Sequence, residues 1–207
     1  MGFLLDQCTF RPYNQTVLDD CQQFDCGNDD LNEFFSQDVV KYNAELLGKS
    51  YCFTLDEDSS VIVCAFTVSN DSIKTLLLPN ARKKKVTKKI PRLKEMRSYP
   101  AVLIGRLGVN KDYRFVDGEA QRTGDQLMDF IKSWFIHPNN KTGCRFIAVD
   151  SYNQEGPMRY YANNGFDTIF SSEEQEKKQM GYSLGKPLET RLLYFDLILL
   201  KVNEEAE

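Results

Sequence analysis

The sequence predicts an α/β protein with a single domain over residues 1–207, and three observations support this prediction. The chain has 207 residues, of which 42% are hydrophobic, so it can bury one sizeable core. Strand-like and helix-like segments follow one another in the order β, α, β, β, a basic segment, β, α, β, α, β, β. Two neighbouring strand segments joined by a polar turn indicate that the sheet contains an antiparallel pair.

The first expected elements are a strand from residue 3 to about residue 11 and a long helix after it. Asn28 and the two aspartates that follow can cap the helix. Apolar residues recur at steps of three and four from Leu31 to Leu47, which is typical of a helix with one buried face. Gly48 is placed to end it, because glycine readily adopts the left-handed conformation common at helix ends.

A hairpin and a central strand are expected in the middle of the chain. Lys49 to Leu55 and Val61 to Ser69 are β-rich runs on either side of the polar cluster 56–60, so they should pair with each other. Ala101 to Val109 is apolar without clean alternation, which predicts a central strand buried on both faces. Glycine inside a strand marks a bulge, bare backbone under a ligand or simple close packing, and all three stay open for Gly108.

The second half should begin with a helix and a strand. Apolar residues repeat at helical spacing from a start near Thr123 to Phe135, and CRFIAV at 144–149 is a buried strand. Pro157 suits the first turn of a short helix that Asn164-Gly165 would end.

The chain should close with two strands. One begins near Asp167, and Arg191 to Leu200 is a strongly β-prone run reached through a long polar connection. Residues 202–207 should form a frayed tail.

Composition excludes several classes of function. The formal net charge of −4 argues against a uniformly basic coat. Because no run of about 18 apolar residues occurs and Asp6 and Arg11 interrupt the N-terminal stretch, we expect a cytoplasmic protein without membrane contact. The six cysteines form no CxxC pair and are expected to be reduced core thiols. The lone His137 gives no basis for a metal site or a Ser/His triad.

The segment 80–97 differs sharply from its surroundings. It contains nine Lys or Arg and one acid, while the rest of the chain carries about −12. One interpretation is a solvated face that keeps the chain soluble. The other is a basic surface segment that contacts phosphates. The residues alone do not decide between them.

Two motifs carry a family resemblance. Gln121-Arg122-Thr123-Gly124 opens the helix after the predicted central strand, where unpaired N–H groups suit a pyrophosphate. Tyr160-Tyr161-Ala162-Asn163-Asn164-Gly165-Phe166 follows later. Together they resemble the GNAT superfamily of acetyl-CoA-dependent N-acetyltransferases, although Arg122 stands where that family usually has glycine. The resemblance implies a mixed, mostly antiparallel central sheet of about 6–7 strands with helices on both faces.

A closer resemblance is to the toxin-type GNAT proteins that acetylate the amino group of aminoacyl-tRNA. It rests on FDCGNDDLNEFF, on YPAVLIGRLGV after a basic stretch, and on RLLYFDL. In that subgroup the basic stretch helps to hold tRNA, so the resemblance implies tRNA contact through residues 82–97 and an antitoxin partner. The expected polyanion-contacting side chains are Arg82, Lys83, Lys84, Lys85, Lys88, Lys89 and Arg106.

The resemblance also implies where acetyl-CoA binds. Backbone groups of Leu107, Gly108 and Val109 would hold the pantetheine arm and polarise the acetyl carbonyl. Asn153, after the next strand, could bind the pantetheine amides or simply form a turn. The remaining expected cofactor contacts, mostly around the pyrophosphate, are Arg114, Gln121, Arg122, Thr123, Gly124, Asp125 and Gln126.

The expected chemistry is direct transfer of the acetyl group, which needs no side-chain nucleophile and no metal. Tyr161 is the candidate general acid for the departing thiolate, since a phenol stays protonated at neutral pH. A packing role suits Tyr160 better. The general base stays unassigned, with Asp150, Glu155, a water chain or an already neutral amine as alternatives.

Three functions stay open. The first is acetylation of a charged tRNA or another amine carried on a polyanion. The second is acetylation of a small-molecule or protein amine, which the acidic remainder of the chain would suit. The third is a non-catalytic acyl-CoA-binding module, which the unusual Arg122 suggests. The chain could act as a monomer or a homodimer.

Overall fold

The apolar run around Ala101 becomes β4 (Tyr99–Val109), the middle strand of a seven-stranded sheet. The structure is a computed structural model that describes residues 2–90 and 98–204. The strand order is β1-β2-β3-β4-β5-β7-β6. The pairs β1–β2, β2–β3, β5–β7 and β6–β7 are antiparallel, which confirms the predicted hairpin and the central place of β4.

The bounds of the elements follow the sequence prediction closely in the middle of the chain. The other strands are β1 (Cys8–Pro12), β2 (Lys49–Leu55), β3 (Ile62–Ile73), β5 (Phe146–Tyr152), β6 (Asp167–Thr168) and β7 (Thr190–Asp196). The helices are α1 (Phe3–Asp6), α2 (Gln15–Asp20), α3 (Asp29–Glu33), α4 (Val39–Ala44), α5 (Asn80–Thr87), α6 (Thr123–Ile136), α7 (Glu155–Asn163), α8 (Glu173–Met180) and α9 (Ile198–Glu204). A π-helical turn, η1 (Phe34–Asp38), joins α3 to α4, and two short 3₁₀ helices are η2 (Thr75–Leu77) and η3 (Lys111–Tyr113).

The chain divides into two compact units. Unit 1 comprises Met1–Ser69 and Ile104–Ser133, and unit 2 comprises Asn70–Leu103 and Trp134–Glu207. The long strands β3 and β4 each contribute residues to both units. A single domain over residues 1–207 stays a prediction.

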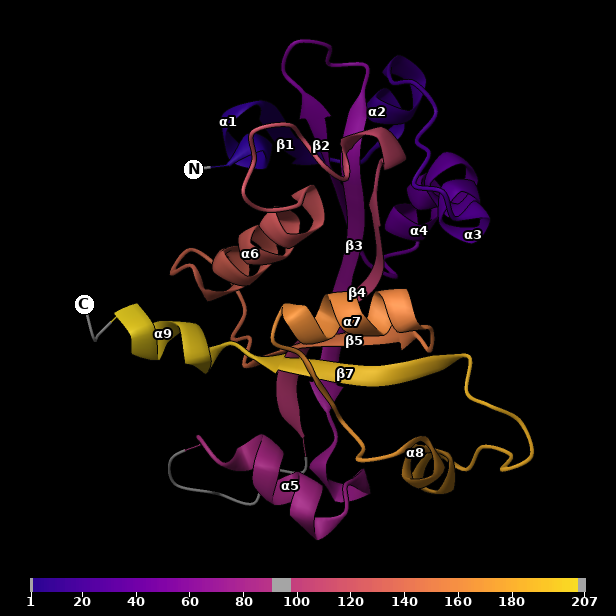
Figure 1. Ribbon diagram of the computed structural model, residues 1–207, viewed down its shortest axis with the longest axis vertical. Helices are drawn as coiled ribbons and strands as arrows, with labels where there is room; N and C mark the ends of the chain where they lie inside the picture. The colour runs from indigo at the N-terminus through magenta and orange to yellow at the C-terminus, as the bar shows by residue number, and fades with distance from the viewer. Residues whose placement is uncertain (1, 91–97, 205–207) are drawn as a thin grey trace. The chain divides into compact units, whose positions relative to one another are not determined.

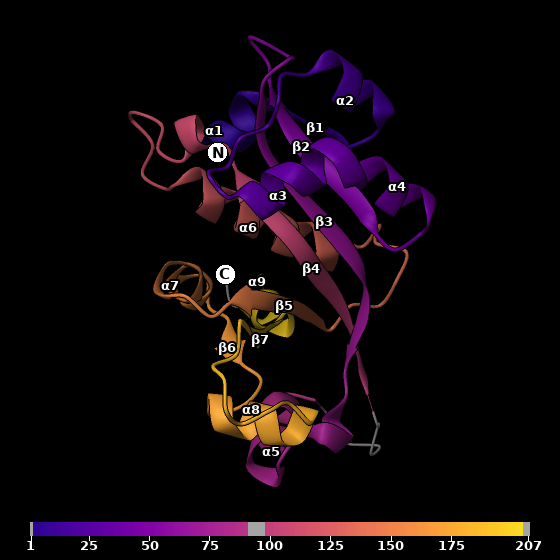
Figure 2. The same cartoon turned by 90° about the vertical axis from the view of Figure 1, so that its right-hand side faces the viewer.

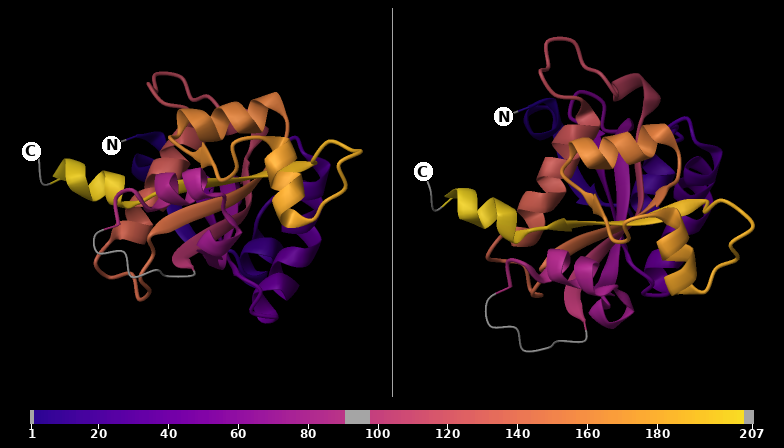
Figure 3. Two further views of the ribbon diagram at one scale, coloured as in Figure 1. Left: turned by 90° about the horizontal axis from the view of Figure 1, so that it is seen from below. Right: turned by 60° about the horizontal axis from the view of Figure 1, so that its bottom comes forward.

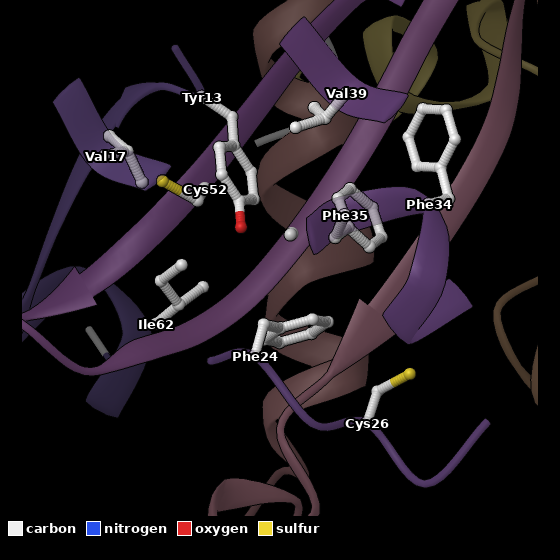
Figure 4. Packing of buried hydrophobic residues seen from close by; sticks show 10 residues of the cluster. Tyr13, Val17, Phe24, Cys26, Phe34, Phe35, Val39, Cys52 and Ile62 are labelled. Atoms are coloured by element: carbon white, nitrogen blue, oxygen red, sulfur yellow. The ribbon is translucent and has the colours of Figure 1, made fainter. Parts of the chain in front are cut away.

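Unit 1 buries both faces of its strands. Figure 2 shows α2, α3 and α4 on one face and α6 on the other. Successive side chains of β2 point to opposite faces of the sheet, as in any β-strand. Cys52 belongs to the cluster under α2 to α4 shown in Figure 4, whereas the Phe53 ring lies 4.9 Å from that of Phe130 on α6. Helices therefore cover both faces of this part of the sheet, as predicted.

Unit 2 has its own core around β5, β6 and β7. Phe146, Ala148 and Tyr194 form one buried cluster with Val86 of α5 and with Phe170. The helix α7 packs against β5 (Figure 1). Figure 3 shows α9 at one end of β7 and α8, with the loop that joins it to β7, at the other.

The helix predicted from Asn28 forms, but it ends differently from the prediction. The Asn28 side chain accepts a hydrogen bond from the N–H of Leu31 at 3.0 Å, which is the expected cap. Leu46, with φ 57°, takes the left-handed conformation expected of Gly48. Gly48 has a different role, because a Cβ there would lie 2.6 Å from the Tyr42 ring. The prediction that Gly48 ends the helix was therefore wrong.

The structure also differs from the prediction in the bounds of the N-terminal strand and in the polar connection before the last strand. The N-terminal stretch contains α1 before β1, and its Leu4 N–H bonds to Gln126 Oε1 at 2.9 Å. The polar connection after Phe170 contains α8, which Ser172 caps and Gly181 ends with φ 73°. Sequence periodicity missed α8 because it has few apolar residues.

The predicted last strand stops at Asp196, and α9 follows. Oδ1 of Asp196 accepts the N–H of Ile198 at 3.3 Å, so the strand's own last residue supports the start of the helix. The apolar run that continues to Leu200 fits a strand or a helix equally well by composition. Residues 202–204 belong to α9 and 205–207 lie outside the described residues, so the frayed tail stays a prediction.

Candidate functional site

The end of β4 is built around a glycine that leaves no space for a side chain. A Cβ at Gly108 would lie 3.1 Å from the Phe24 ring and 3.2 Å from Cβ and Sγ of Cys26. Close packing, one of the three roles left open, is therefore present at Gly108, and its contact with pantetheine stays a prediction. The backbone of Leu107 and Val109 lies on the same stretch of β4, and its contact with pantetheine stays a prediction.

The loop after β4 is tied to the segment around Asp25. Lys111 forms an ion pair with Asp25 at 2.7 Å and donates its backbone N–H to the Asp25 carbonyl at 3.0 Å. The guanidinium of Arg114 donates to the carbonyl of Cys26. Hydrogen bonds from Lys111, Gly27 and Asn32 lower the pKa of Asp25 to about 2. The Arg114 side chain thus has a structural partner, and its predicted contact with acetyl-CoA is untested.

The start of α6 lies where the sequence placed the pyrophosphate-binding turn. Thr123 is buried, donates its hydroxyl to the carbonyl of Tyr113 and donates its N–H to the carbonyl of Arg114 at 3.4 Å. The carbonyl of Arg122 accepts the N–H groups of Asp125 at 3.0 Å and of Gln126 at 3.1 Å. These bonds hold the first turn of a 14-residue helix, whose positive dipole end suits an anion.

Two glutamine side chains from the predicted cofactor-binding residues form hydrogen bonds around the first turn of α6. Gln126 is buried and donates Nε2 to Glu119 Oε2 and to the carbonyl of Gln121, both at 3.1 Å. Gln121 in turn donates its Nε2 to Asp129 at 3.1 Å. Gly124 and Asp125 also belong to the first turn. The side chains of Gln121 and Gln126 therefore shape the site, so ligand contact in this region would use backbone groups.

Arg122, the residue that departs from the family motif, is exposed and stacks on an aromatic ring. Its guanidinium carbon lies 4.6 Å from the centre of the Phe115 ring, and Phe115 itself is 66% exposed. Stacking holds the cation beside the helix start without burying it. Sequence reasoning missed Phe115, although an aromatic residue within the loop FVDGEA was a visible signal.

Tyr161 lies on α7 in unit 2 and is partly buried between two aromatic rings. Its ring centre is 5.1 Å from that of Tyr160 and 5.3 Å from that of Phe166. Burial raises the pKa of the Tyr161 phenol above its ordinary value, so the hydroxyl holds its proton at neutral pH. This suits a proton donor. Pro157 lies in the first turn of α7 and Gly165, with φ 79°, follows its end, as predicted.

Asn153 lies at the end of β5 and joins two segments of unit 2. Its Nδ2 donates to Glu173 Oε2 at 3.1 Å and to the carbonyl of Leu188 at 3.0 Å, and its N–H donates to the carbonyl of Glu189 at 2.8 Å. The structure thus shows the structural use of this asparagine, while its contact with pantetheine stays a prediction.

The basic segment begins as α5, and its cations fall into two groups. Arg82 donates Nε to the carbonyl of Ile169 at 2.8 Å, and Lys85 forms an ion pair with Asp167 at 2.8 Å. Lys85 is exposed despite this pair, as are Lys84, Lys88 and Lys89 in the described part of the segment. Lys83 is half-buried, and residues 91–97 lie outside the described residues.

Arg106, predicted to contact a polyanion, lies on β4 in unit 1. Its guanidinium carbon is 3.9 Å from the centre of the Phe34 ring, and its N–H donates to Thr67 Oγ1 at 3.0 Å. The cation therefore already stacks on an aromatic side chain of the same unit. A polyanion contact of Arg106 stays a prediction.

The cysteines are poor nucleophiles in this structure. All six are free, and Cys8, Cys26, Cys52 and Cys64 are buried, as expected of core thiols. Burial raises the pKa of Cys8 and of Cys52 to about 12, which keeps both protonated at neutral pH.

The described residues contain neither a cluster of metal-binding side chains nor a helix that could span a membrane. Across 2–90 and 98–204, no group of three or more His, Cys, Asp or Glu side chains is arranged to hold a metal ion. No helix in the same ranges is long and apolar enough to span a bilayer.

Comparison with known proteins bears on the fold. No family model and no curated protein sequence matches the chain. Among solved structures, AtaT complexed with acetyl-methionyl-tRNAfMet is 18% identical, with a TM-score of 0.64 over 95% of this chain and 99% of AtaT. The chain has the fold of AtaT. The match confirms the predicted architecture, a mostly antiparallel central sheet with helices on both faces, as a fold shared with AtaT.

Two further structures agree. A KacT variant with a tyrosine replaced by phenylalanine is 18% identical, with a TM-score of 0.64 over 96% of this chain and 99% of KacT. AtaTR bound with acetyl-CoA is 16% identical, with a TM-score of 0.62 over 96% of this chain and 99% of the matched chain.

Proposed function

We propose that this protein is an acetyl-CoA-dependent N-acetyltransferase whose acceptor is the amino group of an aminoacyl-tRNA. The observation that carries the proposal is the fold shared with AtaT over nearly the whole chain, in a structure of AtaT with acetyl-methionyl-tRNAfMet. The two sequence motifs lie at the start of α6 and on α7. The function is thus supported by fold and motif together.

Unit 1 supplies the groups proposed to hold acetyl-CoA. The first turn of α6 offers backbone N–H groups and a helix dipole to the pyrophosphate, and Arg122 adds an exposed cation. Backbone groups of Leu107 to Val109 hold the pantetheine arm and stabilise the charge that develops on the acetyl oxygen. The close packing of Gly108 against Phe24 and Cys26 fixes the path of β4 and thereby the position of these backbone groups.

Tyr161 supplies the proton in the proposed reaction. The acceptor amine attacks the thioester carbonyl, the new C–N bond forms and the C–S bond breaks. The nitrogen loses one proton, and the sulfur of CoA receives one from the Tyr161 hydroxyl. Burial keeps this phenol protonated, so it is a donor throughout the neutral range. An amine that arrives uncharged needs only water to take its proton.

The charge distribution supports a polyanionic acceptor. Of the chain's 26 basic and 30 acidic residues, unit 1 holds 8 and 17 and unit 2 holds 18 and 13, which gives net charges of −9 and +5. The exposed lysines of α5 and of the turn after it belong to unit 2. Such a cluster attracts RNA phosphates and makes binding sensitive to salt.

The test is acetyl-CoA consumption with bulk aminoacyl-tRNA, run beside polyamines, free amino acids and peptides at low and moderate salt. Acetylation of charged tRNA that weakens as salt rises is the expected result. Turnover of a small or peptide amine without salt sensitivity would assign the activity to that acceptor class. Acetyl-CoA binding without turnover of any amine would leave a non-catalytic acyl-CoA-binding module.

A second acceptor class has one observation in its favour. The net charge of −9 on unit 1 would attract a cationic amine, such as a polyamine or a lysine-rich peptide. The competition between tRNA and these amines in the same assay decides between the two classes.

The shared fold also suggests an antitoxin as partner, since one solved structure is AtaT bound to the C-terminus of the antitoxin AtaR. Co-expression with the product of a neighbouring gene, followed by co-purification, tests this part of the proposal. Size-exclusion chromatography with light scattering distinguishes the monomer from the homodimer.

A further inference from the structure

Two side chains of the basic helix α5 are used within unit 2 to hold β6. Arg82 donates Nε to the carbonyl of Ile169 at 2.8 Å and Nη2 to the carbonyl of Thr168. Lys85, one turn later, pairs with Asp167 at 2.8 Å. We call these contacts the α5–β6 latch. A planar guanidinium donating to two consecutive carbonyls fixes both distance and direction, which a lysine cannot do.

Packing on the same side of α5 strengthens the latch. Val86 is 1% exposed and belongs to the buried cluster that also contains Ile169 and Phe170. The N–H of Ile169 donates to the carbonyl of Leu192 on β7 at 2.8 Å. The helix is therefore docked by polar and apolar contacts together, and its exposed lysines project from a docked element.

The strand β6 follows directly from the motif that carries Tyr161. The N–H of Phe166 donates to the carbonyl of Tyr161 at 3.0 Å, and the two rings are 5.3 Å apart. On its other side the Phe166 ring lies 5.6 Å from Phe195. Gly165 makes the turn between them, and a Cβ there would lie 3.2 Å from the Phe195 ring. A shift of Asp167 would therefore move Phe166 and, through it, the Tyr161 ring.

We propose that Arg82 and Lys85 are positioning residues: they tie the polyanion-binding helix to β6 and thereby orient the Tyr161 hydroxyl. The proposal rests on the proposed function for its catalytic consequence, but the latch itself can be tested without activity. The basic segment then has two roles. Lys84, Lys88 and Lys89 contact the polyanion, and Arg82 and Lys85 set the geometry of proton donation.

Arg82→Lys separates positioning from charge. It keeps the positive charge but loses the two-carbonyl fork, so a positioning role predicts that it resembles Arg82→Gln. We expect both variants to lower kcat about tenfold with little change in KM for the acceptor, because small misplacements of a reacting group cost about this much or more. Lys84→Gln, on the same helix, is the matched control and should raise KM while kcat stays constant.

Asp167→Asn provides a second and opposite test. It removes the carboxylate partner of Lys85 and leaves the lysine in place. If Lys85 were mainly a phosphate contact, its release would lower KM for tRNA. A positioning role predicts a kcat several-fold lower and an unchanged KM. Full kcat in Arg82→Lys together with a lower KM in Asp167→Asn would overturn the proposal.

Hydrogen–deuterium exchange tests the latch in the free protein. Peptides covering 161–170 should exchange at least about threefold faster in Arg82→Lys and in Asp167→Asn, because local opening becomes easier. Lys84→Gln should leave them unchanged. Unchanged exchange in both latch variants refutes the latch whatever the enzyme acetylates. If tRNA is not acetylated but exchange responds as expected, the proposed acceptor fails and the latch stands, with kcat then measured on the amine that is turned over.

Discussion

The two units use their cations in opposite ways. In unit 1, which carries −9, the arginines of β4 and of the loop after it bind within the unit: Arg106 stacks on Phe34, Arg114 bonds to the carbonyl of Cys26 and Arg122 stacks on Phe115. In unit 2, which carries +5, four lysines in the described part of the basic segment are exposed, although Lys85 among them pairs with Asp167. The net charge of a segment therefore does not give the number of cations available to bind phosphate, because some of these cations already make contacts within the protein.

Unit 2 also contains the most deeply buried charge pair among the ion pairs of the described residues. The Glu176 side chain is 2% exposed, lies 2.6 Å from Arg191 Nε and accepts the N–H of Leu192 at 2.9 Å. This carboxylate anchors α8 to β7. Removing it would leave a guanidinium buried without its partner.

The largest expected effect is therefore on the stability of unit 2. Glu176→Ala should lower the free energy of unfolding by about 3–5 kcal/mol, since it strips a buried cation of its partner. Denaturant titration followed by circular dichroism measures the change. Glu174→Ala, an exposed neighbour on the same helix, is the control and should change stability by about 0.5 kcal/mol or less. Equal small effects would show that the pair contributes little.

The next largest effect is on activity, at Tyr161. Tyr161→Phe should lower kcat about 100-fold or more and leave acetyl-CoA affinity unchanged, because it removes a proton donor but keeps the ring. Since burial raises the pKa of this phenol, the wild-type rate should not fall between pH 7 and about 9 through loss of its proton. Tyr160→Phe is the control. A folded Tyr161→Phe variant with full turnover would exclude the phenol as general acid.

In unit 1 the sharpest test is the packing of β4. Gly108→Ala places a Cβ 3.1–3.2 Å from Phe24 and Cys26, so we expect about 1–3 kcal/mol of destabilisation from overpacking. Thermal unfolding measures it, and acetyl-CoA binding should weaken in parallel because the strand shifts. Gly143→Ala, where a Cβ meets nothing within 4 Å, is the control. Weaker binding without destabilisation would point instead to direct ligand contact at Gly108.

The exposed lysines of unit 2 should give a moderate effect that depends on salt. Replacing Lys84, Lys88 and Lys89 with Gln should raise KM for aminoacyl-tRNA about tenfold at low salt. The slope of log KM against log salt concentration should correspond to about two to three fewer counterions released on binding. The control carries the same change of charge at three other exposed lysines of unit 2, namely Lys141, Lys178 and Lys186. Equal effects of the two sets would mean that only the net charge of unit 2 matters.

The smallest effect is the response of the two units to acid. The pKa values of Asp25 in unit 1 and of Glu173 in unit 2 are each lowered to about 2, mainly by hydrogen bonds to Lys111 and Lys177. A lowered folded-state pKa adds stability above the unfolded value near 4, and that stability is lost as pH falls from about 5 towards 2. Asp25→Asn and Glu173→Gln should each flatten the acid unfolding curve, and an unchanged curve would mean that the carboxylate contributes nothing.

The sequence by itself determined the elements whose signals are local. Asn28 caps its helix, the polar cluster 56–60 turns the hairpin, and Gly165 ends α7, because capping and turn chemistry depend on a few neighbouring residues. The apolar run of β4 predicted its central place, since only a strand covered on both faces is apolar throughout. The two motifs predicted the fold that the solved structures share.

Only the tertiary structure decided how the charged and small residues are used. Whether Arg82 binds a phosphate or the carbonyls of Thr168 and Ile169 depends on residues more than 80 positions away, and no local pattern encodes that contact. The same is true of the packing of Gly108 against Phe24. It is also true of α8, whose polar sequence shows no helical periodicity and whose Glu176 pairs with Arg191 only in the folded chain. Long side chains and bare backbone fit many partners, and the fold selects one by bringing distant segments together.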